Sequence, residues 1–211
     1  MIAVRVHRPG AGRALDDGGA AMIAVRAAVL ALAAFGGLAC GEAYSPPEPL
    51  RVTVTATGLE DEVATAVPAG AGRVWTVAHV LAGARSVRVA GRPARVLRVD
   101  RRLDLAVLGV DGLRGARPHY GRAGGPAVVH VLRRGRRVRI AARLQRRVLA
   151  AVREPQSGRT DVRPALELRA AVLPGDSGAP VTDARGRLVG MIFARALDGP
   201  ETAWALDVGG F

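Results

Sequence analysis

Residues 175–180 read Gly-Asp-Ser-Gly-Ala-Pro, a pattern whose residue types can do covalent chemistry. A serine on a tight glycine turn exposes its hydroxyl, and neighbouring backbone N–H groups can point at the oxygen of an attacked carbonyl. Ser177 is therefore a candidate nucleophile, and the N–H groups of Gly175 and Ser177 are a candidate oxyanion hole. The same residue types form ordinary hairpin turns, so the hexapeptide alone leaves both interpretations open.

A serine hydroxyl needs a general base, which a third group must orient. Of the four histidines, His79 follows the apolar run 74–78. Asp104 stands at the head of the apolar run 105–108, where an unpaired carboxylate would be costly to bury. A histidine N–H would remove that cost, and the carboxylate would stabilise the imidazolium formed during catalysis. Taken alone, each residue also fits a structural histidine or a strand-end acid.

Three segments, in the order His79, Asp104 and Ser177, resemble motifs of the trypsin- and chymotrypsin-like serine peptidases. Residues 76–79 (Thr-Val-Ala-His) resemble the family's Thr-Ala-Ala-His, residues 104–108 its Asp-hydrophobic-Ala-hydrophobic-Leu, and residues 175–180 its Gly-Asp-Ser-Gly-Gly-Pro. The resemblance covers about residues 50–211. It implies a general base at His79, an orienting acid at Asp104 and a nucleophile at Ser177. It also implies an all-β fold of two six-stranded antiparallel barrels, with the active site between them.

By the same resemblance, the base of the primary specificity pocket lies near Ala171 and its walls near Phe193, Ala194 and Arg195. No acid stands at position 171, so we expect a preference for small or aliphatic side chains rather than for lysine or arginine. In the digestive relatives, the position of Asp176 pairs with a newly cut N-terminus, and this sequence shows no Ile-Val-Gly-Gly-like start. We therefore expect an arginine or backbone partner for Asp176, or a form that needs activation.

The elements that must position these residues are short, valine-rich runs separated by Gly, Pro or Asp, as in β-barrels. The first barrel is expected over about residues 51–118, with strands at 51–57, 62–67, 74–78, 86–90, 94–99 and 105–110. The second is expected over about 126–211, with strands at 127–132, 138–144, 148–152, 165–168, 180–182, 188–193 and 203–206. A glycine-rich linker at 121–125 separates them. His79 and Asp104 then fall in one half and Ser177 in the other, so the site would lie in the cleft between.

Composition limits the chain to one compact domain plus a tail, because 211 residues with 49% hydrophobic side chains can bury a single core. Cys40 is the only cysteine, which excludes an internal disulfide. Among the peptidases that the motifs resemble, this usage favours the bacterial branch, with its HtrA-type and membrane-associated members. No metal ion or cofactor is expected.

The net charge of +13 comes from arginine alone, since the chain has no lysine, and it favours contact with anionic surfaces such as a membrane. The arginine-rich run 133–147 contains no aromatic residue on which a base could stack, which argues against a nucleic-acid site. A solvated edge hairpin, protected by charge from aggregation, is the preferred interpretation of this run.

The N-terminal part is expected to be targeting sequence rather than fold. Residues 1–21 form a Gly-, Arg- and Asp-rich extension, and Met22 is a second candidate start. Residues 22–40 combine a basic start, a 12-residue apolar stretch and small residues, as in a signal peptide. Cys40 is a candidate lipidation site; plain secretion and an uncleaved anchor are the alternatives. Residues 41–50, with three prolines, would be an extended spacer.

These features predict a serine endopeptidase of the bacterial cell envelope, located outside the cytoplasm. It would cleave protein or peptide substrates through an acyl-enzyme. The alternative is a catalytically silent member of the same fold that binds peptides or anionic envelope surfaces. The intact set of His79, Asp104 and Ser177 favours the enzyme. Nothing in the sequence indicates the oligomeric state.

Overall fold

The computed structural model describes residues 3–7, 43–56, 62–153, 158, 160–196 and 201–208. In these ranges the regular elements are β-strands and one short 3-10 helix, η1 (His79–Leu81), so the predicted all-β class is confirmed. The first half contains β2 (Leu50–Ala56), β3 (Glu62–Pro68), β4 (Arg73–Val77), β5 (Ala84–Val89), β6 (Arg92–Pro93), β7 (Arg95–Asp100) and β8 (Leu105–Gly109). The second half contains β9 (Gly125–Arg133), β10 (Arg136–Arg153), β11 (Thr160–Arg169), β12 (Pro180–Asp183), β13 (Leu188–Arg195) and β14 (Thr202–Asp207).

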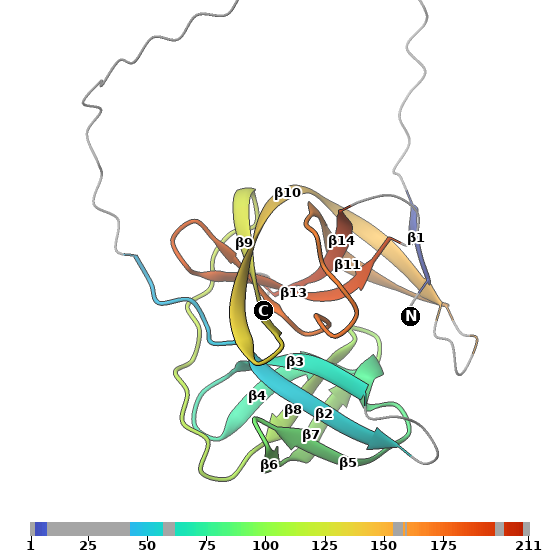
Figure 1. Ribbon diagram of the computed structural model, residues 1–211. Coiled ribbons are helices and arrows are strands. Elements are labelled where there is room, and N and C mark those ends of the chain that lie inside the picture. The colour runs from blue at the N-terminus through green and yellow to red at the C-terminus, as the bar shows by residue number, and fades with distance from the viewer. Residues whose placement is uncertain are drawn as a thin grey trace, which may run out of the picture.

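The second half is a closed ring of six antiparallel strands. Its order is β10-β11-β14-β13-β12-β9, and β9 pairs back onto β10 (Figure 1). The sequence predicted two strands, 138–144 and 148–152, where the structure has the continuous strand β10. The ladder to β11 shifts register between Leu144 and Arg146. A bulge of this kind bends a strand, so one strand can turn the corner of the ring and pair with both neighbours.

The first half is an open, curled sheet of seven strands in the order β6-β5-β2-β3-β4-β8-β7. Among the described residues no ladder joins β6 to β7, so this half differs from the closed six-stranded barrel that we predicted. The shortness of the edge strand β6 explains the difference, because it has only two residues, one of which, Pro93, has no N–H to donate.

The two halves share an apolar core. Side chains alternate along β14, so Ala203 and Ala205 face the interior of the ring while Trp204 and Leu206 pack in a cluster with residues of the first half. That cluster also contains Phe193 of β13. The cleft expected between two barrels is thus flanked by a continuous hydrophobic seam, which fixes one half against the other.

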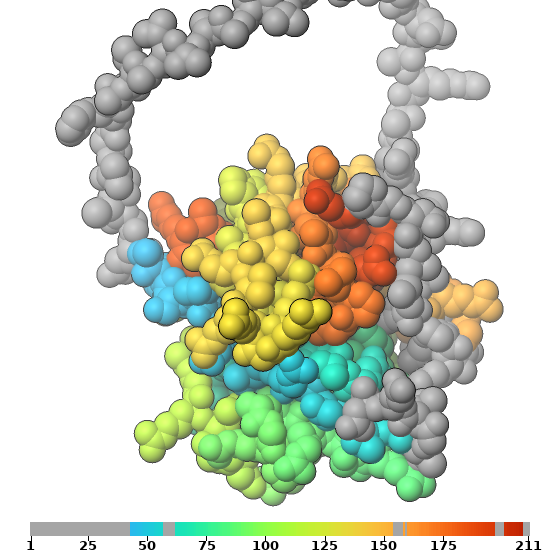
Figure 2. Space-filling model, in the orientation of Figure 1, coloured from blue at the N-terminus to red at the C-terminus, as the bar shows by residue number. Residues whose placement is uncertain are grey.

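The arginine-rich run 133–147 forms the tip of the β9–β10 hairpin and the first part of β10. In Figure 2 this hairpin, in yellow, lies over the seam between the halves. The ladder from β10 to β11 begins at Arg143, and the ladder from β9 to β12 reaches only Val129, so the outer part of the hairpin pairs only within itself, as an edge hairpin does. Four of its arginines have acidic partners: Arg133 with Asp176, Arg137 with Glu48, Arg146 with Glu167, and Arg147 with Asp207. These cations therefore take part in ion pairs within the domain.

Two N-terminal pieces contact the second half. β1 (Ala3–His7) pairs antiparallel with β10, although residues 1–21 were expected to lie outside the fold. The described part of the predicted spacer is also packed: the Tyr44 N–H donates to the Arg185 carbonyl at 2.8 Å. The Tyr44 carbonyl also occupies the space that a Cβ on Gly186 would need. Residues 43–49 are therefore part of the domain surface.

Residues 8–42, with the predicted signal and Cys40, lie outside the described residues. In the part of the chain that is described, no helix has the length and apolar character needed to cross a membrane.

Candidate active site

Ser177 lies in the loop between β11 and β12, on a turn that only glycine permits. Gly175 and Gly178 have positive φ angles of 92° and 86°. A Cβ on Gly178 would also collide with the Thr65 carbonyl of β3. The glycine therefore allows the serine loop to lie directly against the first half of the molecule.

Thr65 binds the serine loop through both its backbone and its side chain. Its N–H donates to the Ser177 carbonyl at 2.7 Å, and its hydroxyl donates to the Gly175 carbonyl at 3.2 Å. The Thr76 hydroxyl in turn donates to the Thr65 carbonyl at 2.8 Å. A loop that belongs to the second half is thus held by hydrogen bonds from β3.

The N–H groups of Gly175 and Ser177 make no hydrogen bond to any other described residue. Both residues line one pocket, and the carbonyls on the same turn are occupied by Thr65. Free backbone donors on a rigid turn are what an oxyanion hole requires.

His79 and Asp104 are joined by two hydrogen bonds. The apolar strand β4 ends at Val77, and His79 starts η1 two residues later. Asp104, with a φ of 59°, turns the chain into β8. Its Oδ1 accepts the His79 backbone N–H at 2.8 Å, and its Oδ2 lies 2.8 Å from His79 Nδ1. Because Nδ1 donates to a carboxylate that is only 4% exposed, Nε2 is left as the proton acceptor.

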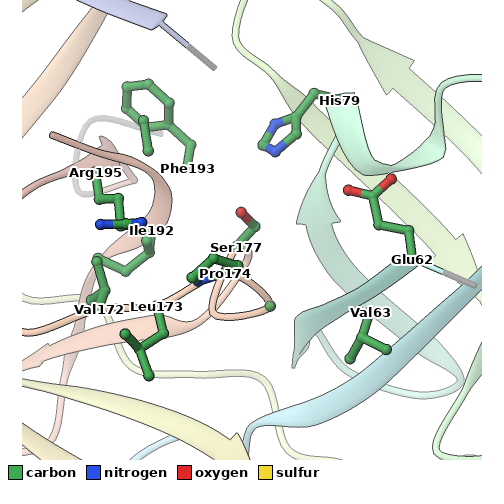
Figure 3. Close-up of a pocket in the computed structure, with 12 residues that line it drawn as sticks. Glu62, Val63, His79, Val172, Leu173, Pro174, Ser177, Ile192, Phe193 and Arg195 are labelled. Carbon is green, nitrogen blue, oxygen red and sulfur yellow. The ribbon is translucent and has the colours of Figure 1, made fainter. Parts of the chain in front are cut away.

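His79 and Ser177 line the same open cleft. Figure 3 shows the His79 ring on one side of the cleft and Arg195 on the other, with Ser177 between them. No hydrogen bond joins the two side chains among the described residues. Such bonds commonly tighten only when substrate fills the site.

The floor of the cleft is apolar. It is lined by Val172, Leu173, Pro174, Ile192, Phe193 and Ala194, with Arg195, Glu62 and Val63 at its sides. Phe193, Ala194 and Arg195 thus lie where the sequence put them. Ala171 does not: it is exposed, and its carbonyl accepts a hydrogen bond from Arg133 at 2.9 Å. A tight turn, in which Val172 N–H donates to Ala170 O at 2.9 Å, accounts for this difference and brings Val172 to the pocket instead.

Asp176 has the partners that we expected of it. Arg133 Nη2 donates to its Oδ2 at 2.8 Å, and so does the Leu173 N–H at 2.8 Å. The Asp176 side chain is only 4% exposed, whereas that of Arg133 is 31% exposed. The cation comes from the hairpin tip of the arginine-rich run, so one residue of that run stabilises the loop next to Ser177.

Arg163 of β11 also enters the site, although no sequence pattern marks it. Its Nη1 lies 3.1 Å from Asp104 Oδ2, and both side chains are buried. Thr65, Glu62, Arg133 and Arg163 were all missed. No local motif marks them, because Thr65, Arg133 and Arg163 meet the serine loop or Asp104, and Glu62 meets the cleft, only through the packing of distant segments.

His130 is buried away from the cleft and bonded to the Thr182 hydroxyl at 2.9 Å. Burial, with a smaller effect of the Arg139 charge, lowers the pKa of His130 to about 4. The side chain is therefore neutral near pH 7 and plays a structural part. Within the described ranges, no three His, Cys, Asp or Glu side chains come together as a metal site.

Three features together are typical of one class of hydrolase. They are an all-β fold in two halves, a hydrogen-bonded His–Asp pair, and a serine on a glycine turn at the same cleft. The chain belongs to the trypsin-like peptidase domain family, whose model matches residues 64–191. The serine protease Rv3671c of Mycobacterium tuberculosis strain H37Rv is 34% identical over 152 residues, which are 65% of this chain and 37% of that protein. The chain thus spans just over a third of the length of this curated relative.

Solved structures agree with this assignment. The active form of the Rv3671c protease superposes with a TM-score of 0.70 at 25% identity, covering 85% of this chain and 90% of the other. An HtrA-type protease, AlgW with a tripeptide, superposes with a TM-score of 0.63 at 24% identity, covering 78% of this chain and 57% of the other. Family and relatives support a serine protease of the trypsin-like type, and the AlgW superposition supports the chymotrypsin-like fold.

Proposed function

We propose that the protein is a serine endopeptidase that hydrolyses peptide bonds through an acyl-enzyme on Ser177. The observation that best supports this is the double hydrogen bond of Asp104 to the backbone and ring of His79, at 2.8 Å each, beside the pocket that also contains Ser177. A purely structural histidine would not need both its backbone and its ring fixed by one carboxylate at the mouth of a cleft.

In the proposed reaction, His79 Nε2 takes the proton of the Ser177 hydroxyl as its oxygen attacks the substrate carbonyl carbon. The resulting oxyanion accepts hydrogen bonds from the N–H groups of Gly175 and Ser177. His79 then gives the proton to the departing amine, which leaves the acyl group on Ser177. Water, activated by the same histidine, attacks the acyl-enzyme and frees the second product.

The proposed substrates are proteins or peptides with a small or aliphatic residue before the scissile bond. Apolar side chains, among them Val172, Ile192 and Phe193, line the cleft, and the Arg195 cation beside them would repel a basic side chain. Glu62 stands on the opposite side of the cleft from Arg195 (Figure 3). Peptide complexes of the similar AlgW fold support peptides as the ligand class. A peptide-library cleavage profile tests the preference.

A fluorophosphonate probe tests the nucleophile. We expect the folded wild type to be labelled, and Ser177→Ala and His79→Ala to be unlabelled or at least 1,000-fold slower. Ser86→Ala, on exposed β5, is the matched control and should label normally. A folded wild type that takes up no probe would overturn the enzyme assignment and favour the catalytically silent alternative.

The proposed place of action is the cell envelope, outside the cytoplasm. The signal-like residues 22–40 support this, together with a strongly basic domain that suits anionic membrane surfaces. If Cys40 is lipidated, Cys40→Ala should move the protein from the membrane fraction to the soluble fraction. An unchanged distribution would remove the lipoprotein hypothesis.

A further inference from the structure

Arg163 is a buried cation in contact with the acid of the proposed triad. Its side chain is 6% exposed, and its Nη1 lies 3.1 Å from Asp104 Oδ2. The same oxygen lies 2.8 Å from His79 Nδ1, while Oδ1 accepts the His79 backbone N–H. The carboxylate of Asp104 is therefore placed between the guanidinium of one half of the molecule and the imidazole of the other.

The contact with Asp104 is a charge pair rather than an aligned hydrogen bond. Arg163 Nη1 and Nε have no hydrogen-bond partner among the described residues. The guanidinium carbon lies 5.7 Å from the centre of the Phe193 ring, which forms part of the pocket floor. Buried donors without partners are costly, and so is a buried charge. Asp104 and Phe193 are both in contact with the Arg163 guanidinium, so the free-energy cost of burying this cation falls at the active site.

Two other charged residues line the hollow behind His79 with Arg163, namely Arg101 and Asp161. Arg101 is exposed, so water screens its charge. Asp161, on β11, is half-buried and is not without a partner. Arg163 is the cation that lies in direct contact with the Asp104 carboxylate.

We propose that Arg163 is a positioning residue that acts through Asp104. It anchors the His79–Asp104 unit, which the first half builds, to β11 of the second half, the half that carries Ser177. It also supplies the charge that keeps the buried carboxylate in place while the carboxylate orients His79. The inference rests on the proposed peptidase function, because the role of Arg163 is to align the base with the nucleophile.

The test measures the inactivation constants kinact and KI for a fluorophosphonate on the full chain. For Arg163→Gln we expect kinact to fall about 10- to 100-fold, because a small misplacement of a catalytic group has effects of this size. KI should stay within about twofold, since Arg163 does not face the bound probe. Arg163→Lys keeps the charge and should recover most of the loss. Arg169→Gln, on the same strand but in a surface pair with Glu201, should match the wild type.

A double-mutant comparison separates this role from a structural one. In an Asp104→Asn background, Arg163→Gln should lower kinact by no more than about twofold, because the group through which it acts has been changed. An equal loss in both backgrounds would overturn the proposal. So would a folded Arg163→Gln with normal kinact. If Arg163→Gln does not fold, a folded Arg163→Lys that labels as slowly as Asp104→Asn overturns it.

The two proposals fail in different ways. A folded wild type that takes up no probe refutes the peptidase function. Normal labelling of the wild type and of Arg163→Gln refutes only the role of Arg163.

Discussion

Replacing Arg133 with methionine removes the cation that faces the buried Asp176 carboxylate. Breaking a fully buried ion pair costs about 3–5 kcal/mol, because one charge is left without compensation. Arg133 is 31% exposed, and the Leu173 N–H still donates to the carboxylate at 2.8 Å. We therefore expect a smaller loss, about 2–3 kcal/mol. At about 2–4 °C per kcal/mol for a domain of this size, Tm should fall by roughly 4–12 °C.

The same change should slow acylation, because Asp176 is the neighbour of Ser177. An unbalanced carboxylate beside the N–H groups of Gly175 and Ser177 disfavours negative charge there, and a displaced donor costs about 100-fold or more. We expect a loss of at least tenfold. Circular dichroism measures Tm, and fluorophosphonate labelling measures the acylation rate.

Arg137→Met is the matched control, because it lies on the same hairpin and its ion pair with Glu48 is exposed. An exposed pair contributes about 0–1 kcal/mol, so Tm should change little. Adding Asp176→Asn to Arg133→Met should restore part of the stability, since no buried charge then remains. If Arg133→Met keeps both its Tm within about 1 °C and normal labelling, the balancing role assigned to Arg133 is wrong.

Three further changes give separate tests. Gly178→Ala should lower the free energy of unfolding by about 3 kcal/mol or more and abolish labelling, because the new Cβ would meet the Thr65 carbonyl. Gly135→Ala should lower it by only about 1–2 kcal/mol, because Gly135 has a φ of 76° but open space around it. Equal effects at the two glycines would contradict this. Between about pH 4 and 6.5, His130 binds fewer protons in the folded than in the unfolded state. The free energy of unfolding of the wild type should therefore fall by about 2–3 kcal/mol as the pH is lowered through this range. His130→Asn, measured by urea unfolding, should not show this part of the loss. If the free energy of unfolding fell equally with pH in wild type and variant, the assignment to His130 would be wrong. Arg195→Ala should admit larger side chains before the scissile bond at a stability cost below about 0.5 kcal/mol; an unchanged cleavage profile would remove Arg195 as a pocket wall.

The sequence predicted the residues that local motifs mark. His79 follows one apolar run, Asp104 precedes another, and Ser177 lies on its own glycine turn. Local patterns of this kind determine the position of a residue at the end of a strand or in a turn. The structure brings His79 and Asp104 within hydrogen-bond distance, and both His79 and Ser177 line the cleft.

The rest depends on contacts between distant segments. Arg133 looked like one cation of an arginine-rich hairpin and Arg163 had no local signal, and only the packing of distant segments brings them to Asp176 and Asp104. Ala171 was placed by the family resemblance, which took no account of the tight turn that points it outward. The bulge in β10 leaves no clear signal in a run that is valine- and arginine-rich throughout, so one bent strand was predicted as two.

Thr65, from the first half, gives the serine loop of the second half two hydrogen bonds. If the two halves separated slightly while each sheet stayed folded, Ser177 would lose its support before any β structure was lost. Labelling by a fluorophosphonate would then report the docking of the halves, whereas circular dichroism would report their folding. Two fragments divided within residues 111–124 should accordingly be inert apart and reactive only after they are mixed.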